Sequence, residues 1–76
     1  MRSSVEFATK QVILTHYRDF KRPVGRKELE DMVQQVVGAG FSSVEFASVL
    51  QKLKDGKAVH EEPTNYFIPM YERVEG

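Results

Sequence analysis

The clearest pattern of apolar and polar positions in this chain lies between residues 43 and 55. Apolar side chains recur there at positions i, i+3, i+4 and i+7, namely Phe46, Val49, Leu50 and Leu53. This spacing puts them on one face of an α-helix. Ser42 and Glu45 form a Ser-x-x-Glu capping box before the stripe, and Gly56 follows it where a left-handed C′ residue is favoured. The pattern predicts a helix over residues 43–55, capped at Gly56.

Two further helices precede this one. An apolar arc with helical spacing covers residues 4–19, and Pro23 follows it, which disfavours the α conformation of the residue before it. A second stripe consists of Leu29, Met32, Val33 and Val36. It predicts a helix over residues 25–37 that stops at Gly38.

The rest of the chain has the pattern of a β-hairpin. Apolar and aromatic residues are frequent over about residues 57–61 and about residues 66–71, and Pro63 and Asn65 lie in the turn between them. Pro69 is expected at a strand end or edge, because it has no backbone N–H to donate. The core predicted from all these patterns consists of Val12, Ile13, Tyr17, Phe20, Leu29, Met32, Val33, Val36, Phe46, Val49, Leu50, Leu53, Val59 and Ile68.

The hexapeptide Ser-Ser-Val-Glu-Phe-Ala occurs twice, at residues 3–8 and 42–47. Each copy opens a predicted helix with a capping box, formed by Ser3 and Glu6 in the first copy. The residues that follow differ, and a repeat array needs about three or more units. The repetition therefore indicates two similar helix starts and not a repeat protein.

Length and composition restrict the class of protein. With 76 residues, 41% of them hydrophobic and 29% charged, the chain is predicted to be a single α+β domain over residues 1–76. It has no cysteine, no apolar run near the roughly 18 to 20 residues of a membrane span, and no signal peptide pattern. We therefore expect an intracellular, cytoplasmic protein without a membrane partner. Eleven basic residues balance eleven acidic ones, which argues against strong nonspecific nucleic-acid binding.

The order helix, helix, helix, hairpin resembles the winged helix-turn-helix superfamily. The resemblance is carried by PVGRKELEDMV for the second helix, FSSVEFASVLQKLKDGKAV for the third helix and first wing strand, and NYFIPMY for the second wing strand. It implies a three-helix α+β domain with a C-terminal β-hairpin wing, acting as a small regulator of transcription that binds double-stranded DNA.

The resemblance also implies that the third helix lies in the major groove. The side opposite its apolar stripe would then face the bases, with Ser43, Ala47, Ser48, Gln51, Lys52 and Lys54. Serine and glutamine can hydrogen-bond base edges, and lysine can bind guanine or phosphate. A solvated helix face would show the same polar pattern, so both interpretations stay open here.

Basic residues are densest over residues 18–27, RDFKRPVGRK, a stretch that we call the basic junction because it joins the first two helices. Basic side chains at the end of the first helix are favourable to its dipole. Arg26 and Lys27 lie instead at a helix start, where the dipole disfavours cations. We expect Arg22, Arg26 and Lys27 to contact DNA phosphates.

The predicted wing argues against DNA binding. Its tip carries Glu61 and Glu62 without lysine or arginine, and His60 offsets them only when protonated. The alternative is a winged-helix module, an adaptor or subunit, that binds a protein partner and no DNA. Lys52 and the basic junction on one face would favour DNA, whereas basic residues on several faces would favour a protein partner.

No motif indicates catalysis. His16 and His60 lie on different predicted elements, and His16 falls inside the apolar arc of the first helix, as a core residue would. Nucleophile triads, glycine-rich phosphate loops and metal-ligand spacings do not stand out. We therefore expect no enzymatic activity, no catalytic or metal-binding residue and no cofactor.

Aromatic residues near the C-terminus suggest a homodimer contact. Period two places Phe67 on the face of the last strand opposite Tyr66 and Ile68, and Tyr71 follows nearby. One of these faces points away from the core unless the first helix covers it. An outward aromatic, on the last strand or on the first helix, is a candidate contact with a second copy of the chain.

Overall fold

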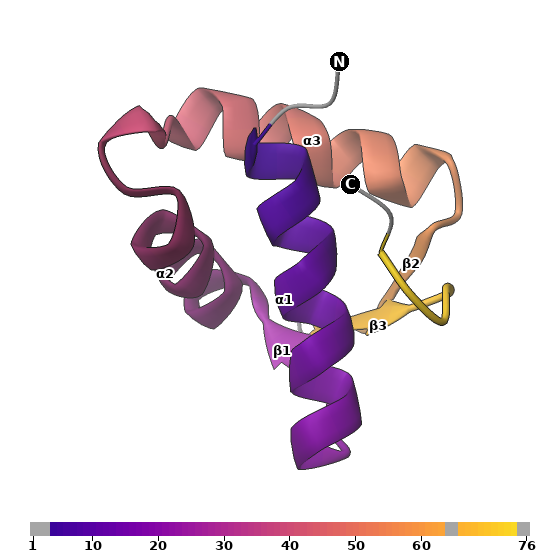
Figure 1. The fold of residues 1–76 in the computed structure, drawn as a ribbon. Coiled ribbons are helices and arrows are strands. Elements are labelled where there is room, and N and C mark those ends of the chain that lie inside the picture. Colours follow the sequence, from indigo (N-terminus) through magenta and orange to yellow (C-terminus); the bar gives the residue numbers. More distant parts are fainter. Residues whose placement is uncertain (1–3, 64–65, 75–76) are drawn as a thin grey trace.

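The computed structural model describes residues 4–63 and 66–74, and within them it has three α-helices and a small antiparallel sheet (Figure 1). In chain order the elements are α1 (Ser4–Phe20), β1 (Val24–Gly25), α2 (Arg26–Val37), the 3₁₀-helix η1 (Gly38–Gly40), α3 (Ser43–Asp55), β2 (Val59–Glu61) and β3 (Tyr66–Pro69). The α+β prediction is confirmed. α3 has the predicted bounds, and α1 and α2 each differ from the prediction by one residue at one end.

Local capping explains most helix ends. The Ser42 hydroxyl accepts a hydrogen bond of 3.3 Å from the Glu45 N–H, as predicted for the start of α3. α2 ends at Gly38, also as predicted. Gly38 has φ 77°, a backbone conformation that glycine adopts readily because it has no Cβ atom. Ser3, the predicted cap of α1, lies outside the described residues.

The sheet has three described strands in the order β1-β3-β2, whereas the sequence pattern predicted two. The predicted hairpin is present, because β2 and β3 pair antiparallel with His60 opposite Ile68. Both strands are shorter than predicted, and the turn residues 64–65 lie outside the described residues. β1 contributes Val24 and Gly25 and pairs with the other edge of β3. Two residues are too few to show a period-two pattern, which is why β1 was not predicted.

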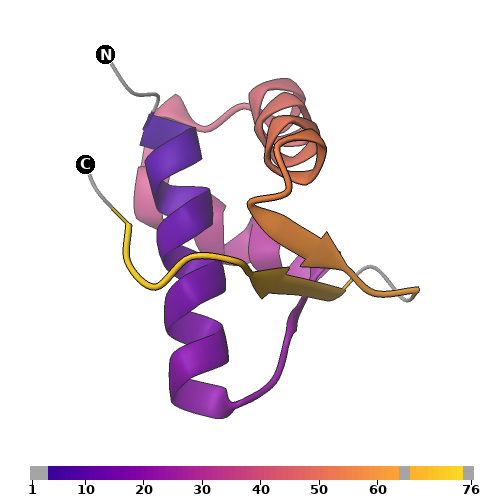
Figure 2. The same ribbon diagram turned by 90° about the vertical axis from the view of Figure 1, so that its right-hand side faces the viewer.

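The core lies between α1, the other two helices and one face of the sheet (Figures 1 and 2). Its buried members are Val5, Ala8, Val12, Ile13, Val24, Leu29, Val33, Phe46, Val49, Leu50, Leu53, Val59 and Phe67. Phe67 is fully buried, whereas Ile68, which was predicted for the core, is only partly buried. The inward face of β3 is therefore the face of Phe67.

The core prediction was wrong at the ends of two helices. Tyr17 and Phe20 are exposed, because the last turn of α1 extends past the sheet (Figure 2). Val36, in the last turn of α2, is 66% exposed. Met32 is only partly buried and packs against the edge of the core. Helical periodicity finds the buried face of a helix but not the point along its axis where the core ends.

The segment after β3 folds back along α1 (Figure 2). The Tyr71 hydroxyl donates a hydrogen bond of 2.7 Å to the Lys10 carbonyl oxygen, and the Lys10 ammonium lies 5.5 Å from the centre of the Tyr71 ring. The Arg18 guanidinium donates to the Glu72 carbonyl oxygen at 3.0 Å. Burial raises the pKa of the Tyr71 phenol. The segment after β3 thus packs against α1 beside the core.

A lysine with left-handed backbone conformation follows each of the helices α1 and α3. Lys21 has φ 58° and Lys57 has φ 59°, and no other described residue except glycine has a positive φ. After α3, the Lys57 N–H donates to the Lys54 carbonyl oxygen at 3.1 Å. The Ala58 N–H donates to the Leu53 carbonyl oxygen at 2.9 Å. These bonds form a Schellman motif with Lys57 at C′. The predicted left-handed cap at Gly56 is therefore wrong by one residue, since Gly56 has φ −81°.

Replacing Lys57 with glycine should stabilise the fold. A side chain in left-handed backbone costs about 1 kcal/mol or more relative to glycine. We expect the free energy of unfolding of Lys57→Gly, measured by urea denaturation, to rise by about 1 kcal/mol. Lys57→Ala removes the same charge but keeps a side chain in this conformation, so it should bring no gain. An equal gain in both variants would contradict the backbone explanation.

Tyr71→Phe should loosen the C-terminal segment from α1. Loss of the hydrogen bond to Lys10 should lower the free energy of unfolding by about 1 kcal/mol. Because the pKa of the folded phenol is raised, stability should also fall as the pH rises above the ordinary tyrosine pKa of about 10. Chemical denaturation from about pH 8 to about pH 11 should show this alkaline loss reduced in Tyr71→Phe and kept in Tyr66→Phe, whose phenol is exposed. The same alkaline loss in both variants would refute the assignment.

Candidate nucleic-acid interface

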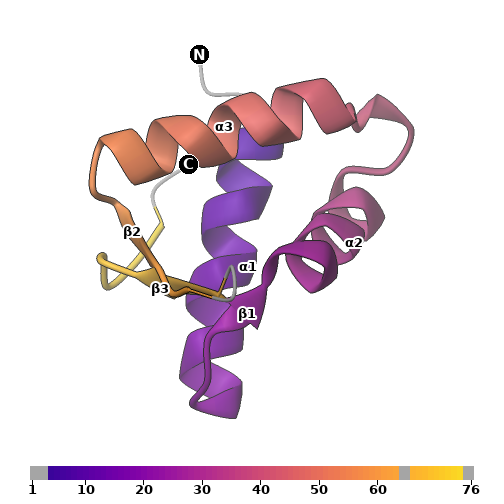
Figure 3. The same cartoon turned by 180° about the vertical axis from the view of Figure 1, so that it is seen from behind.

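One face of the molecule carries α3, the start of α2 and the β2–β3 hairpin, with α1 behind them (Figure 3). α3 turns its predicted apolar stripe inward, and all four stripe residues are buried. Its exposed residues include Ser43, Val44, Ala47, Ser48, Gln51 and Lys52. Lys54 is less exposed than these. The predicted recognition surface is thus largely open to another molecule.

The two lysines of α3 bind carboxylates of other elements. The Lys52 Nζ lies 3.3 Å from Glu6 Oε1 in α1, and the Lys54 Nζ lies 3.4 Å from Glu61 Oε1 in β2. Exposed ion pairs of this kind contribute roughly 0 to 1 kcal/mol, so a phosphate can compete for either lysine. In the structure as it stands, their charge is already balanced.

The outward ridge of α3 has no basic residue, and at its end it carries one exposed acid, Asp55. Gln51 Nε2 donates a hydrogen bond of 2.8 Å to Asp55 Oδ1, which aligns its amide along the helix. Ser48 and Ala47 lie beside it, and Val44 is 80% exposed. Val44 was not among the predicted site residues, because it is apolar. The sequence could have placed it on the outer face, because it lies about 200° around the helix from the buried Phe46.

The basic junction contains both paired and unpaired cations. The Arg22 Nη2 lies 3.8 Å from Glu28 Oε2, so this predicted phosphate contact already has an acidic partner. Arg26 and Lys27 are exposed, and neither has an ion-pair or side-chain hydrogen-bond partner among the described residues. Of the three predicted phosphate contacts, these two therefore have unbalanced charge.

His16 positions the basic junction. It is buried, as expected for a core residue, and its Nδ1 lies 3.3 Å from the Arg22 carbonyl oxygen. Its Nε2 lies 3.6 Å from Glu28 Oε1, and its ring centre lies 4.8 Å from that of Phe20. These contacts hold the loop after α1 against the first turn of α2.

Lys52 and the basic junction do not form one basic stripe. Lys52 reaches Glu6 near the start of α1, whereas Arg22 follows the end of that helix. At a rise of about 1.5 Å per residue, roughly 20 Å of α1 separate the two positions. The cations are instead grouped at the start of α2 and around the end of α3. Since the sequence-based expectation was that one basic face would favour DNA, this arrangement favours a protein partner over DNA.

The acidic residues of the hairpin have basic partners. Glu61 pairs with Lys54, and Glu62 Oε1 lies 3.7 Å from His60 Nε2. The negative charge that would repel phosphate is therefore partly balanced within the chain, although the imidazole contributes charge only when protonated. The objection to DNA binding from the acidic wing is weaker than the sequence suggested.

The aromatic residues proposed as dimer contacts have different environments. Phe67 is buried under the helices, and Tyr71 lies against α1. Tyr66 is 40% exposed on the last strand, and Phe20 is exposed at the end of α1. Homodimerisation through either surface stays a prediction.

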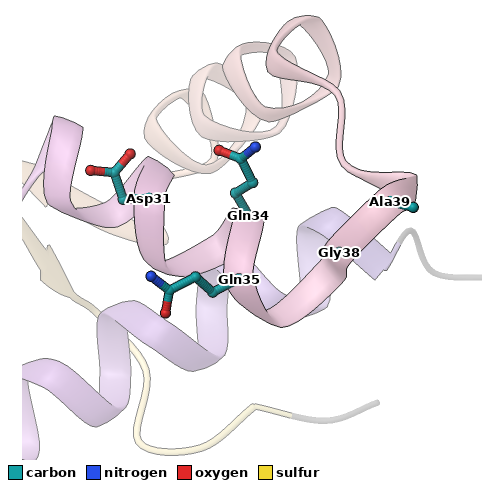
Figure 4. A pocket seen from close by; sticks show the side chains of 5 residues that line it. All are labelled: Asp31, Gln34, Gln35, Gly38 and Ala39. Carbon is teal, nitrogen blue, oxygen red and sulfur yellow. The ribbon is translucent and has the colours of Figure 1, made fainter.

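A shallow hollow lies where α2 meets η1 (Figure 4). It is lined by Asp31, Gln34, Gln35, Gly38 and Ala39. The three polar side chains point in different directions, so they do not converge on one ligand (Figure 4). This hollow offers no built site.

Three further observations concern the described part of the chain as a whole. No three histidine, aspartate or glutamate side chains converge there in a metal-binding arrangement. None of its helices combines the length and apolar character needed to cross a membrane. Comparison of the chain with family models, with curated proteins and with solved structures gave no match.

Proposed function

We propose that this chain is a winged helix-turn-helix domain that binds double-stranded DNA and regulates transcription. The order of its elements supports the fold assignment, because three helices are followed by a hairpin and β1 completes the sheet. In this proposal α3 is the recognition helix and the β2–β3 hairpin is the wing.

The pair of unbalanced cations at the start of α2 carries the proposal. Arg26 and Lys27 belong to the first turn of α2, and this turn lies on the same face as α3 (Figure 3). The helix dipole disfavours cations at that end, so they are poorly explained by the fold alone. A DNA phosphate there would meet both side chains and the positive end of the dipole.

The outward ridge of α3 would enter the major groove. Ser43, Ser48 and Gln51 can hydrogen-bond base edges, and Val44 and Ala47 can contact thymine methyl groups. Because this ridge has no cation and ends in the acid Asp55, it would contribute sequence readout, and cations beside it would contribute most of the affinity. The lysines of α3 would reach DNA only by leaving their carboxylate partners.

Arg26→Ala should weaken binding to every DNA sequence. We expect the plot of log affinity against log salt to flatten by about one unit, since one phosphate contact is lost. Fluorescence anisotropy with random duplex at about 50 mM and about 200 mM salt measures this. Lys10→Ala is the matched control and should leave the slope unchanged, because Lys10 lies in α1 with its ammonium over the Tyr71 ring and not on the face of α3. Equal flattening in both variants would contradict the assignment to the start of α2.

Gln51→Ala should reduce sequence discrimination with little change in the salt slope. Its amide lies on the ridge assigned to the bases, and a good base contact contributes about 1–3 kcal/mol of discrimination. A selection from random duplexes, followed by titration of selected and scrambled sites, measures the ratio of the two affinities. An equal loss on both sites would show that Gln51 does not read sequence.

A protein-interaction module is the second candidate. Val36 lies in the last turn of α2 and Val44 in the first turn of α3, so two exposed valines lie on either side of η1. Exposed apolar side chains of this kind fit a protein surface as well as a groove. Absence of binding to random duplex at about 50 mM salt would favour this candidate, because phosphate contacts are strongest at low salt.

A homodimer would suit the DNA-binding proposal. One module of this size buries too little surface for high specific affinity, and a second copy doubles the contacts. Tyr66 and the exposed aromatics of α1 are the surfaces that would meet it.

A further inference from the structure

Lys57 occupies a backbone position that suits glycine. It is the C′ residue of α3 with φ 59°, while Gly56 directly before it has an ordinary φ of −81°. Left-handed backbone is unfavourable for any residue with a Cβ atom. Strained positions of this kind are concentrated at functional sites. A lysine at this position therefore calls for a role of its side chain.

The side chain of Lys57 lines a hollow between the end of α3 and β2. The residues around it are Lys54, Lys57, Val59, His60, Glu61 and Met70. Lys54 is held there by Glu61 at 3.4 Å. Lys57 has no ion-pair or side-chain hydrogen-bond partner among the described residues, and His60 is exposed. Three residues that can donate to an anion therefore line the hollow. Lys57 has no acidic partner among the described residues, whereas Lys54 lies beside Glu61 and His60 Nε2 lies 3.7 Å from Glu62 Oε1.

We propose that this hollow binds a phosphate group through Lys57, Lys54 and His60. Ammonium and imidazole N–H groups donate charge-assisted hydrogen bonds to phosphate oxygens. The exposed pair of Lys54 with Glu61 is weak enough for a phosphate to share this lysine. That the phosphate belongs to a DNA backbone rests on the function proposed above. Free phosphate is the other source.

The position of the hollow fits a duplex docked on α3. Arg26 and Lys27 lie in the first turn of α2, and the hollow lies at the end of α3, so cations lie on either side of the outward ridge. The major groove is about 12 Å wide and bounded by phosphates on both strands. α3, at about 1.5 Å per residue, is long enough to extend across such a groove.

A purely structural role for Lys57 can be tested against a second lysine of the same chain. A lysine at a helix end also interacts favourably with the helix dipole, without any ligand. Lys21 shares this role, because it has φ 58°, is exposed, and follows α1 with its N–H donating to the Tyr17 carbonyl oxygen at 3.0 Å. The end of α1 lies far from α3 (Figures 1 and 2). Lys21 belongs to the basic junction, but it is not one of the residues assigned to phosphates, and it differs from Lys57 in its position relative to the proposed site.

Lys57→Gly and Lys21→Gly provide the first test. Each removes one charge and one left-handed lysine, so neither should unfold the chain. With random duplex, Lys57→Gly should flatten the salt slope by about one unit and bind roughly tenfold more weakly at about 0.1 M salt. Lys21→Gly should stay within about twofold of the parent chain. Equal losses in both variants, or no loss in Lys57→Gly, would overturn the proposal for DNA phosphate.

Inorganic phosphate separates the two sources. Amide chemical shifts of the ¹⁵N-labelled chain, titrated with sodium phosphate against sodium chloride at matched ionic strength, should move around Lys57 and His60 and stay fixed in Lys57→Gly. Phosphate shifts without DNA binding would support the hollow while rejecting the proposed DNA function. If Lys57→Gly binds DNA as tightly as the parent chain and phosphate causes no chemical-shift changes, the phosphate site in the hollow is rejected. The proposed DNA function is then unaffected.

Discussion

The packing of α1 is the constraint on which the rest of the structure depends. This helix contacts α2, α3, β1 and β3, and Ile13 near its middle is fully buried. The segment after β3 covers a further side through Tyr71 and Glu72. A chain of this length has one small core, so one helix must support both other helices and the sheet. As a consequence, α3 and the hairpin can present a broad surface only on the side away from α1, which is the side proposed to meet DNA.

The repeated hexapeptide shows how far local sequence determines this fold. Both copies begin a helix at the second serine, so the capping pattern predicted the element and its start. The faces that they bury are nevertheless opposite. In α1, Val5 is buried and Phe7 is partly exposed, whereas in α3 Val44 is 80% exposed and Phe46 is fully buried. The apolar residues further along each helix decide which face turns inward, and six residues cannot carry that information.

Features that depend on distant partners were the ones that the sequence could not predict. Helix bounds follow from caps and periodicity within a few residues, and these were predicted to within one residue. β1 exists because β3 has an open edge beside Val24, and two residues give no periodic signal. The partners of Lys52 and Lys54 lie in α1 and β2, so the sequence could place these lysines on a face but could not predict that their charge is balanced. The choice of Lys57 over Gly56 for the left-handed position likewise depends on how the chain enters β2.

The balance of charge over the whole chain is a poor guide to what its surfaces bind. Glu6, Glu28 and Glu61 each lie against a cation of another segment, so the chain itself balances part of their charge. Arg26, Lys27 and Lys57 have no acidic partner among the described residues, and they lie on either side of the outward ridge of α3. Binding built on so few phosphate contacts must be modest in affinity and moderately sensitive to salt. Such a domain gains useful affinity for a site only if a second copy, or a second module, binds beside it.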